Sequence, residues 1–161
     1  MRRAGVAPSR QVQRHHSGTL PACSPAEMGR LMLRILVVDD EQPVRDALGL
    51  LLKREGYRVV VAEGGHAALS AIETFMFDIV IVDIFMPDMN GLDTIDVIRR
   101  DAPGVPIIVM SGYAEGSGAT GPDFFRDAVA RGATCCLRKP FNRDQLIDAI
   151  MFCRVTKAMV A

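Results

Sequence analysis

Five short runs of apolar, largely β-branched residues alternate along this chain with segments in which apolar residues recur at helical spacing. The runs are residues 34–38, 57–62, 78–83, 107–110 and 134–138. Such runs, without regular polar alternation, are typical of strands buried on both faces. Their alternation with helices predicts an α/β fold, (βα)5, in which helices doubly wind a five-stranded parallel sheet. A length of 161 residues with 49% hydrophobic side chains is compatible with one such domain.

The helical segments carry their own boundary signals. Pro43 suits the first turn of the first helix, and Gly56 and Gly132 each end a helix. The apolar positions of the second helix extend to Met76, and the last helix is expected to start near Asn142.

The residues that follow the strands carry the functional signal, because ligands of doubly wound sheets bind beyond the carboxyl ends of the strands. These positions hold Asp39 and Asp40 after the first strand, Asp83 at the end of the third, Ser111 after the fourth and Lys139 after the fifth. Three carboxylates at one edge repel each other unless a divalent cation lies among them. A small cluster of hard oxygen ligands favours Mg²⁺.

A lysine and a serine at the same edge extend this site to a cradle for a phosphoryl group. Phosphoryl transfer depends mainly on positioning and on neutralising charge, which Mg²⁺, Lys139 and Ser111 can supply together. A carboxylate can itself be the nucleophile and form an acyl phosphate. We therefore expect Asp83 to be the attacking group, with Asp39 and Asp40 holding the metal.

Simpler interpretations of the same residues remain open. Asp39 and Asp40 can cap a helix or a turn, and Asp83 can cap a turn. Ser111 can serve turn chemistry alone, and Lys139 can be a solvated charge at the edge of the sheet.

Four segments, in this order, resemble the receiver domain of two-component response regulators. They are ILVVDDE (35–41), DIVIVDIFMPDMNG (78–91), IIVMSGY (107–113) and LRKPF (137–141). The similarity covers about residues 33–155. It implies a cytoplasmic bacterial signalling protein with the flavodoxin-like strand order 2-1-3-4-5 and a cis peptide bond between Lys139 and Pro140.

The resemblance also implies a reaction and its partners. A histidine kinase or a histidine phosphotransfer protein donates a phosphoryl group to Asp83. Mg²⁺ is held by Asp40, Asp83 and the backbone carbonyl of Phe85, while Asp39 acts partly through water. The expectation is a stand-alone response regulator that is not an enzyme beyond its own phosphorylation and slow dephosphorylation. It signals by binding an unidentified output protein.

In the family, phosphorylation changes the partner preference of the face formed by the fourth helix, the fifth strand and the fifth helix. Lys139 pairs with the phosphoryl group, and Ser111 turns inward to it. The resemblance assigns switch roles to Ser111, Tyr113, Cys136 and Pro140. Cys136 departs from the pattern, because the family often has an aromatic residue three positions before the lysine. The usual aromatic switch is therefore not expected.

Two further departures concern the same end of the sheet. The segment from Ser111 to Gly132 is longer than is usual in the family and contains the Gly-rich stretch 115–121. We expect this stretch to be mobile, either as a tolerated insertion or as an altered output surface. Phe85 and Tyr113 place bulky rings where the family tunes dephosphorylation, which predicts a long-lived aspartyl phosphate.

Charge separates the two parts of the chain. Residues 1–30 carry five arginines and one glutamate, whereas residues 31–161 carry more acidic than basic side chains. We expect a flexible basic tail (1–30) and a receiver domain (31–161) that binds no nucleic acid, inserts into no membrane and is a monomer or weak dimer. The tail either has no role, precedes a true start at Met28 or Met32, or acts as a basic anchor.

The four cysteines lack metal-binding spacing. Cys135 and Cys136 are adjacent in the fifth run and should point to opposite faces of the strand. The sequence favours buried free thiols, with a vicinal disulfide or a redox switch as the alternative.

Three rival functions fit these residues less well than phosphorylation-based signalling does. A haloacid-dehalogenase-type phosphatase needs a second acid two residues after the nucleophile, where this chain has Phe85. A flavodoxin-like nucleotide binder needs a Gly-rich loop after the first strand, which is missing. A receiver-like interaction module that takes no phosphate remains an alternative, because of Cys136 and the long segment after Ser111.

Overall fold

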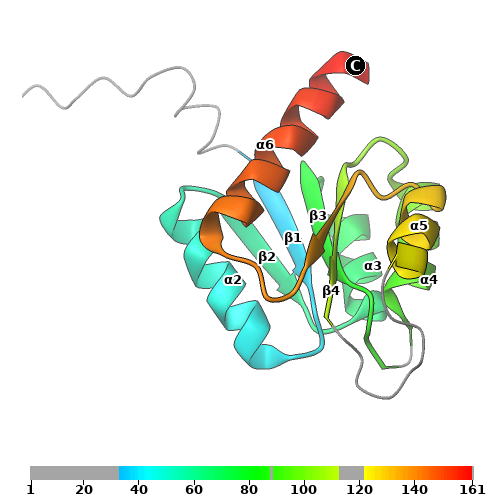
Figure 1. The fold of residues 1–161 in the computed structure, drawn as a ribbon, viewed down its shortest axis with the longest axis horizontal. Helices are drawn as coiled ribbons and strands as arrows, with labels where there is room; N and C mark the ends of the chain where they lie inside the picture. The colour runs from blue at the N-terminus through cyan, green and yellow to red at the C-terminus, as the bar shows by residue number, and fades with distance from the viewer. Residues whose placement is uncertain (1–32, 88, 113–121, 161) are drawn as a thin grey trace, which may run out of the picture.

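The computed structural model describes residues 33–87, 89–112 and 122–160, and these form an open sheet with helices on both faces (Figure 1). The strands are β1 (Arg34–Val38), β2 (Arg58–Ala62), β3 (Ile79–Asp83), β4 (Ile107–Ser111) and β5 (Cys135–Arg138). The helices are α2 (Gln42–Arg54), α3 (Gly65–Thr74), α4 (Gly91–Asp101), α5 (Pro122–Ala130) and α6 (Arg143–Val160). The expected tail of residues 1–30 and the Gly-rich stretch 115–121 lie outside the described residues.

All five strands are parallel and pair in the order β2-β1-β3-β4-β5, which confirms the expected topology. The order reverses between β1 and β3, whose ends carry the acidic residues. In register, Val38 of β1 pairs with Val82 of β3, and Asp83 pairs with Met110 of β4. The carboxyl ends of the three central strands therefore meet at one edge of the sheet.

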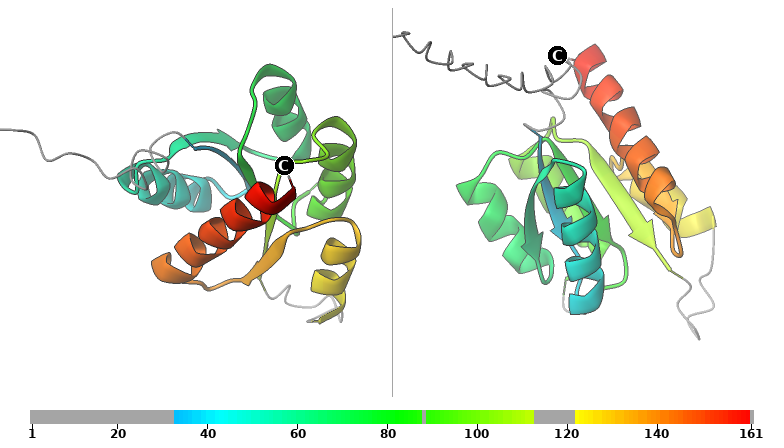
Figure 2. Two further views of the ribbon diagram at one scale, coloured as in Figure 1. Left: turned by 90° about the horizontal axis from the view of Figure 1, so that it is seen from above. Right: turned by 90° about the vertical axis from the view of Figure 1, so that its left-hand side faces the viewer.

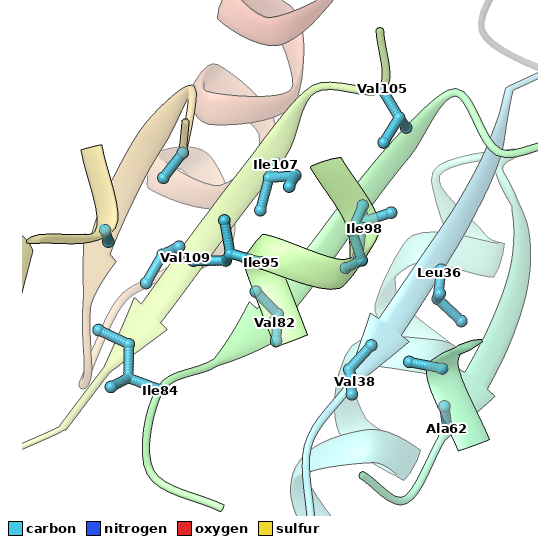
Figure 3. Close-up of a cluster of buried hydrophobic side chains, with 14 of the residues drawn as sticks. Leu36, Val38, Ala62, Val82, Ile84, Ile95, Ile98, Val105, Ile107 and Val109 are labelled. Carbon is cyan, nitrogen blue, oxygen red and sulfur yellow. The ribbon is translucent and has the colours of Figure 1, made fainter. Parts of the chain in front are cut away.

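Alternate residues of the central strands feed two separate cores, one on each face of the sheet (Figure 2). On one face, α3, α4 and α5 cover the strands, and Ile95 and Ile98 of α4 pack on Val82 and Val109 (Figure 3). On the other face, α2 and α6 cover residues that include Ile35, Val37, Ile79, Ile81 and Ile108. Burial of the strands on both faces explains why their sequences are continuous apolar runs.

Helix boundaries follow local chemistry that the sequence already carries. The Asn90 side chain caps α4 by accepting a hydrogen bond of 2.9 Å from the backbone N–H of Asp93. Asn142 and Gln145 exchange two hydrogen bonds of 2.9 Å at the start of α6, as in a capping box. Gly56 and Gly132 take positive φ angles of 86° and 101° just after α2 and α5.

The expected extension of the second helix to Met76 is wrong. Helix α3 ends at Thr74, Phe75 is extended, and the Met76 side chain is 87% exposed. The ring of Phe75 instead packs edge-on against Phe77 and lies under the guanidinium of Arg34. The contact with Arg34 of β1 and the contact with the nearby Phe77 ring favour an extended path for residues 75–77.

Candidate functional site

Three carboxylates gather at the carboxyl ends of β1 and β3. Asp39 and Asp40 follow β1 directly, and Asp83 is the last residue of β3. One oxygen of each carboxylate lies within 4.8 Å of the others. Asp39 and Asp83 are buried while Asp40 is partly exposed, so the cluster opens to solvent on the Asp40 side.

Lys139 reaches this cluster from the loop after β5. Its Nζ lies 2.8 Å from Oδ2 of Asp39 and 2.8 Å from Oδ2 of Asp83. The Lys139–Pro140 peptide bond is cis, as expected. One ammonium therefore bridges two buried carboxylates that are far away in the sequence.

The single positive charge of Lys139 does not balance the three carboxylates of the cluster. Burial raises the pKa of the Asp83 carboxyl above its usual value, although the hydrogen bond and charge of Lys139 act in the opposite direction. Burial alone would lower the pKa of Lys139, but its hydrogen bonds to Asp39 and Asp83 outweigh burial and raise it. Three acids facing one base favour a further cation at this edge.

Arg45 of α2 is a supporting residue that sequence reasoning missed. Its Nη1 donates to the backbone carbonyls of Asp39 (2.8 Å) and Asp40 (2.7 Å). The backbone N–H of Glu41 donates to Oδ1 of Asp39 at 2.9 Å. The turn between β1 and α2 is thereby held in a shape that points the Asp39 carboxylate at Lys139. An arginine in the first helical turn was the available signal, but its target became visible only in three dimensions.

The loop after β3 is folded tightly back onto the strand. The N–H of Gly91 donates to the carbonyl of Ile84 at 2.9 Å. A Cβ at position 91 would collide with the carbonyl oxygen of Asp83 and lie 2.6 Å from Cα of Ile84. Glycine is thus required by the close approach of α4 to the backbone that carries Asp83.

Phe85 connects the same loop to α5. Its backbone N–H lies 3.4 Å from Oδ1 of Asp83, and its ring meets the ring of Phe124 edge-on, with centroids 5.2 Å apart. Phe124 belongs to α5, so a direct aromatic contact joins the acidic cluster to that helix. Sequence reasoning considered Phe85 only for its carbonyl and its bulk.

The remaining expected site residues that the structure describes, Ser111, Cys136 and Pro140, lie outside the carboxylate–lysine contacts. Ser111 is buried at the end of β4; its hydroxyl donates to the carbonyl of Gly112 at 3.2 Å, and its carbonyl accepts from the Lys139 N–H at 2.7 Å. Cys136 is half-buried on the α3–α4–α5 face, and Pro140 is exposed. Tyr113 lies outside the described residues.

Comparison with known proteins decides the family. The response regulator receiver domain family matches residues 35–151, most of the chain. The chain belongs to this family. Phosphorylation-based signalling with histidine kinases and output proteins is the general activity of receiver domains, and they generally bind Mg²⁺. The acidic cluster of this receiver has the oxygen ligands for that ion.

Individual relatives agree with this assignment. A putative NtrX-like response regulator of Rickettsia bellii is 33% identical over 129 residues, which are 78% of this chain and 26% of that protein. A receiver domain protein of Clostridium thermocellum has a TM-score of 0.72 and 27% identity, covering 80% of this chain and 99% of that chain. The Vibrio cholerae chemotaxis protein CheY4 has a TM-score of 0.67 and 30% identity, covering 74% of this chain and 97% of that chain.

The receiver spans less than half the length of the curated relatives it matches, for example 26% and 46% of two of them. Among the described residues, no helix combines the length and the apolar character needed to cross a membrane.

Proposed function

We propose that this receiver accepts a phosphoryl group on Asp83 from a histidine kinase or a histidine phosphotransfer protein. The supporting observation is the bridge of Lys139 Nζ to Asp83 and Asp39, with the Asp40 carboxylate beside it. A carboxylate oxygen of Asp83 attacks phosphorus while the bond from phosphorus to the histidine nitrogen breaks. In this proposal, the ammonium of Lys139 neutralises part of the negative charge of the phosphoryl oxygens.

The residues present fit a magnesium site, since three hard oxygen donors lie within reach of one point and one of them faces solvent. Asp40, Asp83 and the backbone carbonyl of Phe85 would hold the ion, with Asp39 acting through water. When bound, Mg²⁺ supplies positive charge that the acidic cluster lacks and that a phosphoryl group needs.

Ser111 and helix α5 are proposed to carry the response. The Ser111 hydroxyl exchanges its bond to the Gly112 carbonyl for one to the phosphoryl group, which moves the end of β4. The contact between Phe85 and Phe124 gives a second route from the site to α5. Exposed apolar side chains on α5 and α6, among them Val129, Phe152 and Val155, offer a surface for an output protein.

Phosphorylation with a small P–N donor tests this function. Phosphoramidate with Mg²⁺ is expected to add one phosphoryl group to the full chain, and hydroxylamine should remove it, as it does from acyl phosphates. Asp83→Asn should lose the modification, whereas Asp101→Asn, at the other end of the sheet, should keep it. EDTA should prevent it.

A result without phosphorylation would favour the alternative function. If the folded chain takes no phosphoryl group and Mg²⁺ with beryllofluoride does not raise its Tm, the receiver is a phosphorylation-silent interaction module. Sustained turnover of small phosphomonoesters would instead indicate an enzyme, against the proposal of a single self-phosphorylation.

A further inference from the structure

Cys135, Cys136 and Cys153 lie close to the boundary between β5 and α6, and none of these three forms a disulfide. Cys135 and Cys136 point to opposite faces of β5, as expected for neighbours in a strand. Cys136 packs with the core under α3, α4 and α5, whereas Cys135 packs with the core under α2 and α6. The expected alternative of a vicinal disulfide is therefore not what the structure contains.

Cys135 and Cys153 face one core from β5 and α6, respectively. Both views in Figure 2 place α6 along the side of the sheet on which β5 lies. The Cys153 side chain is fully buried in the core under α2 and α6, and Cys135 packs against that same core from the neighbouring strand. Cys135 is half-buried and lies on the edge strand, so a small solute has a shorter route to Cys135 than to Cys153.

The three thiols differ in the direction in which their surroundings shift the pKa, which assigns them different roles in an oxidation. The hydrogen bond from Cys153 lowers the pKa of Cys135, although burial opposes this. The same hydrogen bond and burial raise the pKa of Cys153. Burial and the nearby Cys135 raise the pKa of Cys136 to about 11. Since the thiolate is the nucleophile, Cys135 is the reactive thiol, Cys153 is the partner that holds the proton, and Cys136 is inert.

We propose that Cys135 and Cys153 are a redox pair that forms a reversible disulfide between β5 and α6 when a hydroperoxide oxidises the protein. The Cys135 sulfur attacks one peroxide oxygen and the O–O bond breaks, which gives a sulfenic acid and, from hydrogen peroxide, water. The Cys153 sulfur then attacks the Cys135 sulfur, the S–OH bond breaks, and a second water leaves. Two thiols and one hydrogen peroxide thus become one disulfide and two waters.

Burial of Cys153 makes the intramolecular product favoured. A sulfenic acid at Cys135 shares its core with the Cys153 thiol, whereas an external thiol must approach from solvent. The disulfide covalently links the edge strand to the last helix of the fold. This modification does not depend on phosphorylation of Asp83, so the two functions can be tested separately.

The direct test is to oxidise the full, folded chain with hydrogen peroxide and identify the linked peptides. After unreacted thiols are blocked, cleavage at arginine joins residues 132–138 to residues 144–154 if the pair forms. Because residues 132–138 contain both neighbouring cysteines, Cys136→Ala is the matched control and should form the link to the wild-type extent. Cys135→Ala and Cys153→Ala should lose it, and dithiothreitol should reverse it.

A trap for the intermediate separates a redox pair from two unrelated thiols. With dimedone present, Cys153→Ala should accumulate roughly tenfold more sulfenic adduct at Cys135 than the wild type, because no thiol resolves it. Cys153→Ser provides a second variant that nearly preserves the buried volume. Two results with the folded wild-type chain would overturn the proposed redox pair. One is a disulfide to Cys136 or Cys23 in place of the Cys135–Cys153 link, and the other is sulfinic acid at Cys135 without any link.

Discussion

Removal of the Lys139 ammonium tests the electrostatic description of the acidic cluster most directly. The side chain of Lys139 is 21% exposed, and its partners Asp39 and Asp83 are 0% and 6% exposed. Removing one member of a buried ion pair usually costs about 3–5 kcal/mol, because the remaining charge stays buried. Asp83 can take up a proton in response, which lowers the cost. We therefore expect Lys139→Met to lower the free energy of unfolding by about 2–3 kcal/mol in EDTA at pH 7.

The loss should be measured by urea unfolding followed by circular dichroism, and it corresponds to a decrease in Tm of roughly 10 °C for a domain of this size. Lys157→Met is the matched control, because Lys157 forms a 3.2 Å pair with Asp78 in which both side chains are about two-fifths exposed. An exposed pair of this kind contributes about 0–1 kcal/mol.

The pH dependence supplies the decisive comparison. Because the pKa of Lys139 is raised, its stabilising effect is present at neutral pH and is lost only as the pH rises through the folded-state value. On the acid side, protonation of Asp83, whose pKa burial raises, removes one partner, so the difference between variant and wild type should shrink. A loss no larger than that of Lys157→Met, or one of equal size at acidic and neutral pH, would refute the reasoning.

Four further predictions concern the loop after β3 and its neighbours. Burial raises the pKa of Asp83, so the folded state loses stability as the pH rises from the usual value of 3.8 through the folded-state pKa. The Asp83→Asn variant should therefore have a higher Tm than the wild type in EDTA at pH 7, and this gain should vanish below pH 3.8. Gly91→Ala should lower the free energy of unfolding in urea by more than about 3 kcal/mol and impair phosphorylation. Gly104→Ala, whose Cβ would meet nothing within 4 Å, should change that free energy by less than about 0.5 kcal/mol. Phe124→Ala should cost about 2 kcal/mol and Phe124→Leu less than half of that, since leucine refills most of the space beside Phe85. The aspartyl phosphate should persist for minutes with Mg²⁺ in a phosphate-release assay, because the Phe85 ring hinders water; a lifetime of seconds would count against this.

Most of the fold could be predicted because its signals are local. The apolar runs located all five strands to within a residue or so at each end, and Pro43, Gly56 and Gly132 marked helix boundaries where the structure has them. The error at Met76 had a nonlocal cause. Apolar spacing alone continued α3, but Phe75 is extended and its ring lies under the guanidinium of Arg34, which belongs to β1.

The candidate site divides in the same way. The parallel topology places five polar residues at one edge, because the carboxyl ends of the strands in such a sheet share an edge. They are Asp39, Asp40, Asp83, Ser111 and Lys139. The hydrogen bonds between the side chains at this edge could not be predicted from the topology. The Ser111 hydroxyl binds its neighbour's carbonyl, and Arg45 supports the turn that carries Asp39.

The amino-acid sequence by itself determined the alternation of strands and helices, the edge at which the acids lie and the family to which the chain belongs. These depend on hydrophobic period and on short motifs, which act over a few residues. Only the tertiary structure decided that one ammonium bridges Asp39 and Asp83, that the rings of Phe85 and Phe124 meet, and that Cys135 and Cys153 share one core. Such contacts depend on how helices and strands pack side by side, to within an ångström, and no local pattern in the chain encodes that distance.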